Sequence, residues 1–193
     1  MKVVIIDYGA GNIRSVQFAF RRLGVEPVVS NHAELISTAD RVVFPGVGQA
    51  SSAMEKLQVT GLNRLLPDLN QPVLGICLGM QLMCHHTDEN HTPGLGIFDC
   101  IVRKFPDNVK VPQIGWNEVQ QLKGSLFKGI KEKEYMYLVH SYYAEECLDT
   151  VACCQYGLKY SAALSKGNFY GVQFHPEKSS DAGERLLQNF LNL

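Results

Sequence analysis

Cys77 lies between two glycines where the chain passes from a short apolar run to a helical pattern. The apolar run, residues 73–76, follows the turn residues Asn70-Gln71-Pro72 and is typical of a buried strand. A nucleophile between glycines at a strand-to-helix turn is the arrangement of the Gly-x-Ser-x-Gly elbow, here with Cys in place of Ser. Because the next helix directs its amide groups and the positive end of its dipole toward the sulfur, the thiolate is favoured. The spacing therefore predicts a catalytic cysteine, and the alternative is a buried apolar thiol.

A cysteine nucleophile needs a base that also protonates the leaving group, and the base needs a partner that fixes its tautomer. His175-Pro176-Glu177 supplies both groups directly after an apolar strand pattern at residues 170–174. Side chains two residues apart share one face of a strand, and Pro176 ends strand pairing. We therefore expect His175 to act as the base and Glu177 to orient it.

The remaining histidines fit a catalytic role less well. His140 follows another predicted strand and stays the alternative base. His85 belongs to the helix predicted after Cys77 and would lie about 12 Å along its axis from the thiol, too far for proton transfer. His86 and His91 have acidic neighbours that suggest a metal cluster, but a solvated helix end and loop is the simpler interpretation. We expect no metal site.

The loop Pro45-Gly46-Val47-Gly48 follows a predicted strand at residues 42–44. In elbow hydrolases, the oxyanion hole combines the amide after the nucleophile with an amide from the loop after a neighbouring strand. Here those groups are the Leu78 amide and the Gly46-Val47-Gly48 backbone, whose glycines permit the peptide orientation that such a hole requires. An ordinary turn is the alternative for this loop.

The length and composition are those of an ordinary globular protein, and we expect one domain over residues 1–193. The formal net charge of −1 provides no basic footprint for nucleic acid and no attraction to an anionic membrane. No segment resembles a signal peptide or approaches the ~20 apolar residues of a transmembrane helix. The five cysteines other than Cys77 lack metal or redox spacing, so free thiols and a cytoplasmic location are expected.

Strand and helix patterns alternate along the first part of the chain. The apolar run at residues 3–6 predicts a strand buried on both faces, and helical spacing follows from Ile13 to Leu23. Asn12 is then an N-cap, with a partner-facing role as the alternative. Further strands are predicted at residues 25–29, 42–44 and 73–76, with helices at 33–38, at 50–57 and after Gly79. This order predicts a parallel sheet with right-handed crossovers.

The middle of the chain, about residues 94–139, changes to short β-rich runs separated by Pro, Gly and charged loops. Strands are predicted there at residues 97–105, 116–122 and 135–139, and later at 151–155, 162–165 and 170–174, before a helix at 181–191. The expected fold class is α/β: an open, mostly parallel, flavodoxin-like sheet with helices on both faces and antiparallel strands added in the middle of the chain.

Gly75-Ile76-Cys77-Leu78-Gly79, with His175-Pro176-Glu177 downstream, resembles the class I, triad-type glutamine amidotransferase family. Further motifs make the chain similar to glutaminase subunits of imidazole glycerol phosphate synthases, from histidine biosynthesis: Asp7-Tyr8-Gly9-x-Gly11-Asn12, Pro45-Gly46-Val47-Gly48, Gly115-Trp116-Asn117, His140-Ser141-Tyr142 and the segment from Phe169 to Glu177. The resemblance covers nearly the whole chain. It departs at Gln113, where His is expected, and this affects a partner-facing loop rather than the chemistry.

The resemblance implies an enzyme without a cofactor that hydrolyses L-glutamine to glutamate and ammonia through a thioester on Cys77. His175, oriented by Glu177, would protonate the departing ammonia and then activate water. Positions that hold the glutamine head group in similar proteins match four residues here: Gln81, Glu89, Ser141 and Tyr142. In the simpler interpretation Gln81 is a polar helix residue and Glu89 a solvated loop charge.

The ammonia needs an acceptor, and the sequence contains no P-loop or second domain for one. The resemblance implies a heterodimer with a (β/α)₈ cyclase subunit, which receives the ammonia through a protected channel. Asn12, Trp116 and Lys178 match interface or gating positions; otherwise they would be a helix cap, a core aromatic and a surface cation. Two alternatives stay open: an ammonia donor for another synthase, such as one for a surface sugar or pyridoxal phosphate, or a catalytically idle binding or thiol-sensing module.

Overall fold

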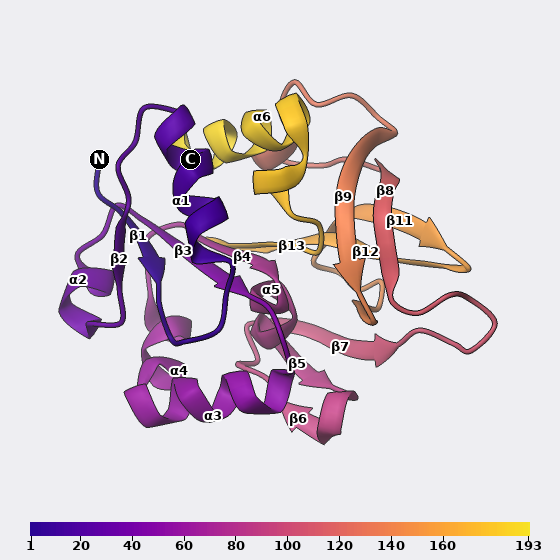
Figure 1. Ribbon diagram of the computed structural model, residues 1–193, viewed down its shortest axis with the longest axis horizontal. Coiled ribbons are helices and arrows are strands. Elements are labelled where there is room, and N and C mark those ends of the chain that lie inside the picture. Colours follow the sequence, from indigo (N-terminus) through magenta and orange to yellow (C-terminus); the bar gives the residue numbers. More distant parts are fainter.

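A single thirteen-stranded sheet runs through the computed structural model, which describes residues 1–193 (Figure 1). Its parallel part has the order β2-β1-β3-β4-β13. The bounds of these strands are Val28–Ser30, Val3–Ile6, Arg41–Gly46, Val73–Cys77 and Phe169–Val172, respectively. The prediction of an α/β sheet with a parallel part is confirmed, because every crossover among β1, β2, β3 and β4 contains a helix.

Antiparallel strands extend the sheet beyond β13. The order continues through β12 (Leu158–Lys166), β10 (Tyr142–Ala144), β7 (Phe98–Lys104), β5 (Cys84–Thr87) and β6 (Thr92–Pro93), and only the β5–β7 pair in this part is parallel. A branch leaves β12 through β11 (Thr150–Tyr156) to β8 (Gln113–Gln120) and β9 (Glu134–His140). The predicted antiparallel addition is therefore confirmed, and it makes up more of the sheet than the sequence suggested.

Helices cover both faces of the parallel strands, as predicted (Figure 1). On one face lie α1 (Ile13–Arg22) and α6 (Ser180–Leu191), and on the other lie α2 (Ala33–Ser37), α3 (Ala50–Thr60) and α4 (Leu62–Leu65). The side chains of β1 are apolar on both faces of the sheet. Val3 and Ile5 pack in the cluster with α1 and α6, while Val4 and Ile6 pack in the cluster with α2, α3 and α4. None of the helices is both long enough and apolar enough to cross a membrane.

Two predicted elements differ in the structure. The strand predicted at 25–29 is confined to β2, because Val25 still bonds to the end of α1 through the Phe20 carbonyl and Pro27 has no N–H to give to a ladder. The helix predicted to continue through His85 ends at Met83, where α5 (Leu78–Met83) gives way to β5. The carbonyls of Leu82, Met83 and Cys84 accept hydrogen bonds from the backbone amides of Leu95, Ile97 and Gly96, respectively. The last carbonyls of the helix are therefore satisfied by a distant segment rather than by a further helical turn.

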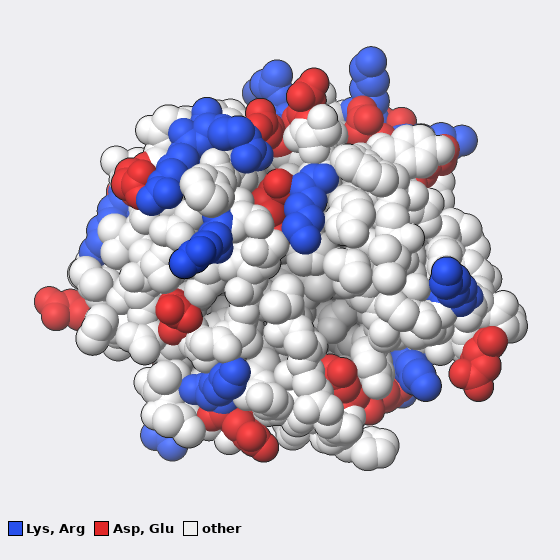
Figure 2. Space-filling model, viewed as in Figure 1, with Lys and Arg blue, Asp and Glu red and all other residues white.

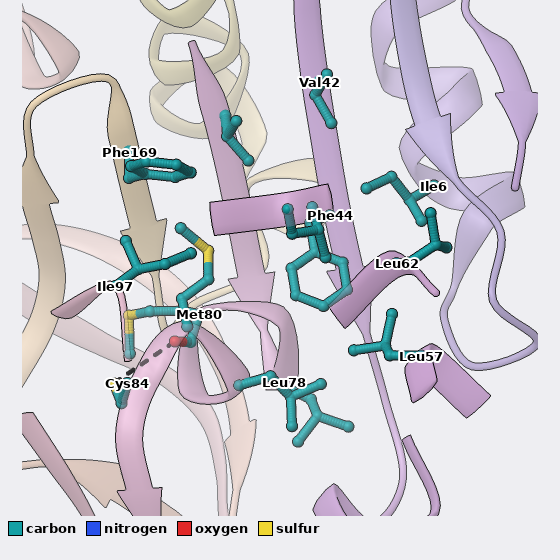
Figure 3. Close-up of a cluster of buried hydrophobic side chains, with 14 of the residues drawn as sticks. Ile6, Val42, Phe44, Leu57, Leu62, Leu78, Met80, Cys84, Ile97 and Phe169 are labelled. Carbon is teal, nitrogen blue, oxygen red and sulfur yellow. Dashed lines mark hydrogen bonds between the residues drawn. The ribbon is translucent and has the colours of Figure 1, made fainter. Parts of the chain in front are cut away.

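The turn between β4 and α5 is held in place by two glycines. A methyl group on Gly79 would collide with the carbonyl oxygen of Phe44 in the neighbouring strand β3, and one on Gly75 would lie 2.6 Å from Met83 Sδ. Figure 3 shows Phe44 of β3 together with Leu78 and Met80 of α5 in the apolar cluster next to this turn. Cys77 itself has φ 54° and ψ −111°, a strained backbone conformation for a residue with a side chain.

Gly79→Ala should destabilise the protein by about 3 kcal/mol, because the colliding atom belongs to the backbone of β3 and cannot turn away. The measurement is the free energy of unfolding in urea, with Gly11→Ala as the matched control. A methyl group at Gly11 meets its nearest neighbour at an ordinary 3.4 Å. Equal stability of the two variants would contradict the close approach of α5 to β3.

Cys77→Gly should be more stable than Cys77→Ala by about 1 kcal/mol, the reverse of the usual order in regular structure. The reason is that only glycine adopts φ 54° and ψ −111° without a clash of its side chain. Thermal and urea unfolding of the two variants would measure the difference. A more stable alanine variant would show that the turn carries no strain at this position.

Candidate active site

The elbow opens into a cavity of about 340 Å³ at the carboxyl ends of β3 and β4. Nine of the residues predicted to form a site line it: Val47, Gly48, Cys77, Leu78, Gln81, Glu89, Ser141, Tyr142 and His175. Pro112, Val139 and His140 complete the wall. Gly46 and Glu177 are buried behind the lining. Residues from six separate parts of the chain therefore meet at one cavity.

Cys77 lies at the floor of this cavity and is 7% exposed. It is the last residue of β4 and immediately precedes α5, so its sulfur lies near the amino end of that helix. The thiol faces the Val139 carbonyl at 3.9 Å, and the side-chain amide of Gln173 donates to the sulfur at 3.7 Å. The sulfur is thus open to the cavity on one side and held by polar groups on the other.

His175 and Glu177 form a buried pair, with His175 Nδ1 2.8 Å from Glu177 Oε1. The strand alternation expected for them is wrong: β13 ends at Val172, and Pro176–Lys178 form a 3-10 turn, η4. This turn folds the Glu177 carboxylate back onto the ring. Because the carboxylate can only accept, Nδ1 carries the proton and Nε2 is left for the cavity. His175 Nε2 makes no hydrogen bond of standard geometry.

The electrostatic surroundings of His175 act in opposite directions. Burial lowers the pKa of its imidazole, whereas the Cys77 sulfur close to the ring and the hydrogen-bonded Glu177 carboxylate raise it, and the net result is a pKa of about 10. The attraction is large because the three groups are shielded from water. His175 is therefore protonated at neutral pH when it faces a Cys77 thiolate, and can serve first as a proton donor.

The loop after β3 lies against the start of α5. Gly46 pairs in register with Cys77, and Val47 and Gly48 follow at the rim of the cavity, with Gly48 at φ 95°. The Leu78 amide belongs to the first residue of α5 and so has no partner within the helix. The predicted oxyanion groups are thus neighbours of the sulfur. Glu89 holds the other end of this loop, because its Oε2 accepts from the amide of Ala50, the first residue of α3.

Gln81 lies one turn along α5 from the elbow and is 5% exposed. Its Nε2 donates to the backbone carbonyl of Tyr142 and to Gln173 Oε1, both at 2.8 Å. Both amide protons are therefore used inside the protein, and only the acceptor Oε1 is left for a ligand. The predicted pair Ser141 and Tyr142 also lines the cavity, and Tyr142 contributes its carbonyl to this network.

His140, the alternative base, is engaged elsewhere. Its Nδ1 donates to the Tyr142 carbonyl at 2.7 Å, and its Nε2 faces the hydroxyl of Tyr160 at 3.3 Å. Burial lowers the pKa of His140 to about 4, so the ring is neutral at pH 7. Tyr160 also donates to Gln113 Oε1 at 2.9 Å. Gln113 is therefore a buried residue at the start of β8, not part of an exposed loop.

The three predicted interface residues lie outside the cavity. Trp116 is 51% exposed and packs edge-on against Tyr137, with ring centroids 6.0 Å apart, so it is not a core aromatic. The ammonium nitrogen of Lys178 lies over the same Tyr137 ring, 5.7 Å from its centroid. Asn12 is the N-cap residue of α1, as predicted, because its carbonyl accepts from the Val16 amide, but its side chain makes no capping hydrogen bond. Helix α1 packs beside η4.

Sequence reasoning missed Gln173 and Tyr160, which are fully buried polar residues in the network behind the cavity. A signal was present for Gln173, because it interrupts the apolar strand pattern Tyr170 to Phe174 and a buried amide needs partners. His86 and His91 stack with ring centroids 6.5 Å apart, on β5 and η2 rather than at a helix end. No group of three or more His, Cys, Asp or Glu side chains is arranged to hold a metal ion.

Comparison with known proteins places this geometry in a family. Residues 4–193 match the model of class-I glutamine amidotransferases. Proteins named imidazole glycerol phosphate synthase subunit HisH are 52% identical in Bacteroides fragilis (strain YCH46) and 49% identical in Pectobacterium atrosepticum, each over 196 residues and 100% of both chains. A crystal structure described as a glutamine amidotransferase has a TM-score of 0.78 at 17% identity, covers 98% of this chain and 97% of its own, and supports the fold alone. The resemblance inferred from the sequence motifs is confirmed: the chain belongs to the class-I glutamine amidotransferase family.

Proposed function

We propose that the chain is the glutaminase subunit of an imidazole glycerol phosphate synthase, acting in histidine biosynthesis. It hydrolyses L-glutamine to glutamate and ammonia and delivers the ammonia to a separate cyclase subunit. The observation that carries the proposal is the buried His175–Glu177 pair beside a cysteine at an elbow, all at one cavity. Relatives of nearly equal length, named as subunits of that synthase, support the choice of substrate and pathway.

The first half of the reaction is attack on the side-chain amide of glutamine. The Cys77 thiolate adds to the carbonyl carbon, and the amide of Leu78 with the Gly46-Val47-Gly48 backbone stabilises the oxygen as it becomes negative. The protonated Nε2 of His175 gives its proton to the amide nitrogen, and ammonia leaves. A γ-glutamyl thioester remains on Cys77.

The second half regenerates the thiolate. His175, now neutral, takes a proton from water while that water attacks the thioester carbon. Glutamate leaves with the new oxygen, and Cys77 is again a thiolate beside a protonated imidazole. Glu177 accepts from the ring at 2.8 Å and stabilises its positive charge, so the carboxylate orients His175 without taking its proton.

Glutamine is held by polar groups that line the cavity. Gln81 has only Oε1 free, so it is suited to accept from the α-ammonium group of glutamine rather than to bind its carboxylate. Ser141 and Tyr142 offer further polar groups in the lining. Glu89 lines the cavity and also anchors α3, so its removal would affect both binding and the loop that precedes α3.

The cyclase partner is a (β/α)₈ subunit that forms a heterodimer with this chain, and it docks on the face that carries Asn12, Trp116 and Lys178. On the face drawn in Figure 2, acidic and basic side chains are interspersed around a largely uncharged middle, which suits a protein partner rather than nucleic acid. We assign all of residues 1–193 to one glutaminase domain in the cytoplasm. Six free thiols support a reducing compartment.

The purified chain should hydrolyse glutamine slowly, and much faster with a cyclase subunit that carries its nucleotide ligand. We expect this dependence because ammonia released without the partner would be lost to solvent. The measurement is glutamate release with each component omitted in turn. Full activity of the isolated chain would contradict the coupling.

Cys77→Ala should abolish glutamate release while leaving the fold and the complex intact. Activity at the wild-type level in that variant would remove Cys77 from the mechanism.

Glu177→Gln should move the alkaline limb of kcat/KM to lower pH by about one unit or more. Glu177 helps to raise the pKa of His175 to about 10, so the wild-type ring stays protonated until high pH. Without the carboxylate that pKa falls, and the proton donor is lost earlier as pH rises. Glu26→Gln, at an exposed carboxylate paired with Arg21, is the control and should leave the profile unchanged. An unshifted profile in a folded Glu177→Gln variant would exclude Glu177 as the partner of His175.

A further inference from the structure

Gln173 is a fully buried amide that takes no part in the acyl-transfer steps but contacts two residues of the cavity. Its Oε1 accepts from Gln81 Nε2 at 2.8 Å, and its Nε2 donates to Cys77 Sγ at 3.7 Å. Burying an amide costs free energy unless its polar atoms are hydrogen-bonded. Here each end of the amide bonds to a different residue of the proposed reaction.

The orientation of both amides is fixed by one backbone carbonyl. The Tyr142 oxygen can only accept, so the Gln81 atom that faces it must be the nitrogen. The same nitrogen faces Gln173, which must therefore present its oxygen and keep its nitrogen for the sulfur. Rotating either amide by a half turn would set like atoms against each other, so the direction of the chain from Tyr142 to Cys77 is determined.

His140 reinforces this direction from the other side. Its Nδ1 donates to the same Tyr142 oxygen at 2.7 Å, and the ring is buried and neutral. The carbonyl thus accepts two hydrogen bonds and has no lone pair left for another donor. Neither His140 nor Gln81 can turn away without leaving a buried polar atom unpaired.

We propose that Gln173 is a positioning residue that holds the Cys77 thiolate with its amide nitrogen and sets the orientation of Gln81 with its amide oxygen. This inference rests on the proposed glutaminase function. An N–H donor beside the sulfur favours the thiolate and fixes the side-chain rotamer of Cys77 for attack. The same amide keeps Gln81 Oε1 turned to the cavity, where the α-ammonium group of the substrate binds. One side chain thereby couples nucleophile and substrate site.

Two variants separate the two ends of the amide. Gln173→Met has nearly the same length but loses both hydrogen bonds, so the midpoint of Cys77 alkylation against pH should rise by about one unit and KM for glutamine by about tenfold. Gln173→Glu keeps an acceptor for Gln81 but puts a carboxylate beside the sulfur. Its alkylation midpoint should rise at least as much as in Gln173→Met, while KM stays within about threefold of wild type.

The alkylation is measured on the full chain with iodoacetamide, by mass spectrometry of the peptide that contains Cys77. The other ionisable groups at the sulfur are unchanged in both variants: His175, His140 and Glu89 at the cavity and the buried Tyr8 hydroxyl. KM is measured in the complex with the cyclase subunit. Because alkylation needs no glutamine, it tests the contact to Cys77 even where the proposed substrate is wrong.

Gln71→Met is the matched control, since Gln71 donates to the Ile36 carbonyl near the opposite end of β4 from Cys77. It should leave both the alkylation profile and KM unchanged. Circular dichroism and thermal unfolding establish that each variant is folded. An unmoved alkylation midpoint in both folded Gln173 variants would overturn the proposal, and so would an equal shift in Gln71→Met. If Gln173→Met does not fold, Gln173→Glu alone decides between these results.

Discussion

The close approach of α5 to β3 at Gly79 is the constraint on which the site depends. Only a glycine lets the first turn of this helix rest on the Phe44 carbonyl, and this contact fixes the helix relative to the sheet. The Leu78 amide, the Gly46 backbone and the Cys77 sulfur are consequently brought together by main-chain packing rather than by long side chains. The strained φ of Cys77 is the local cost of that geometry, and the apolar cluster around Phe44 and Met80 offsets it (Figure 3).

The neighbours of each buried group then decide its chemistry. Two histidines lie at the same cavity and both are nearly inaccessible to water, yet their pKa values move in opposite directions. His140 has a carbonyl and a phenol as neighbours, so burial dominates and the ring is neutral. His175 has Cys77 and Glu177, whose charges outweigh burial and keep the ring protonated. The identity of the partner, not the degree of burial, separates a structural histidine from one that can move a proton.

The sequence predicted the parts of the fold that follow from local pattern and turn chemistry. The parallel strands, the elbow and the pairing of His175 with Glu177 were recognisable because apolar runs, glycines and short spacing carry them. The backbone geometry that pairs them was not recognisable, since a 3-10 turn and a continued strand are both compatible with His-Pro-Glu. The end of α5 at Met83 and the branch through β8, β9 and β11 depend on hydrogen bonds between distant segments, which no local window contains.

The residues proposed to face the partner and those proposed to react are joined by very short pieces of backbone. His175 immediately precedes the η4 turn, in which Glu177 is buried and Lys178 is exposed. Tyr137 connects the two, because its carbonyl accepts from the His175 amide, its amide donates to Ser179 Oγ, and its ring contacts both Trp116 and Lys178. A protein bound over that ring would therefore act on the backbone that positions the imidazole. Under the proposed function, this proximity supplies a physical route by which docking of the cyclase affects glutamine hydrolysis without any large movement of the sheet.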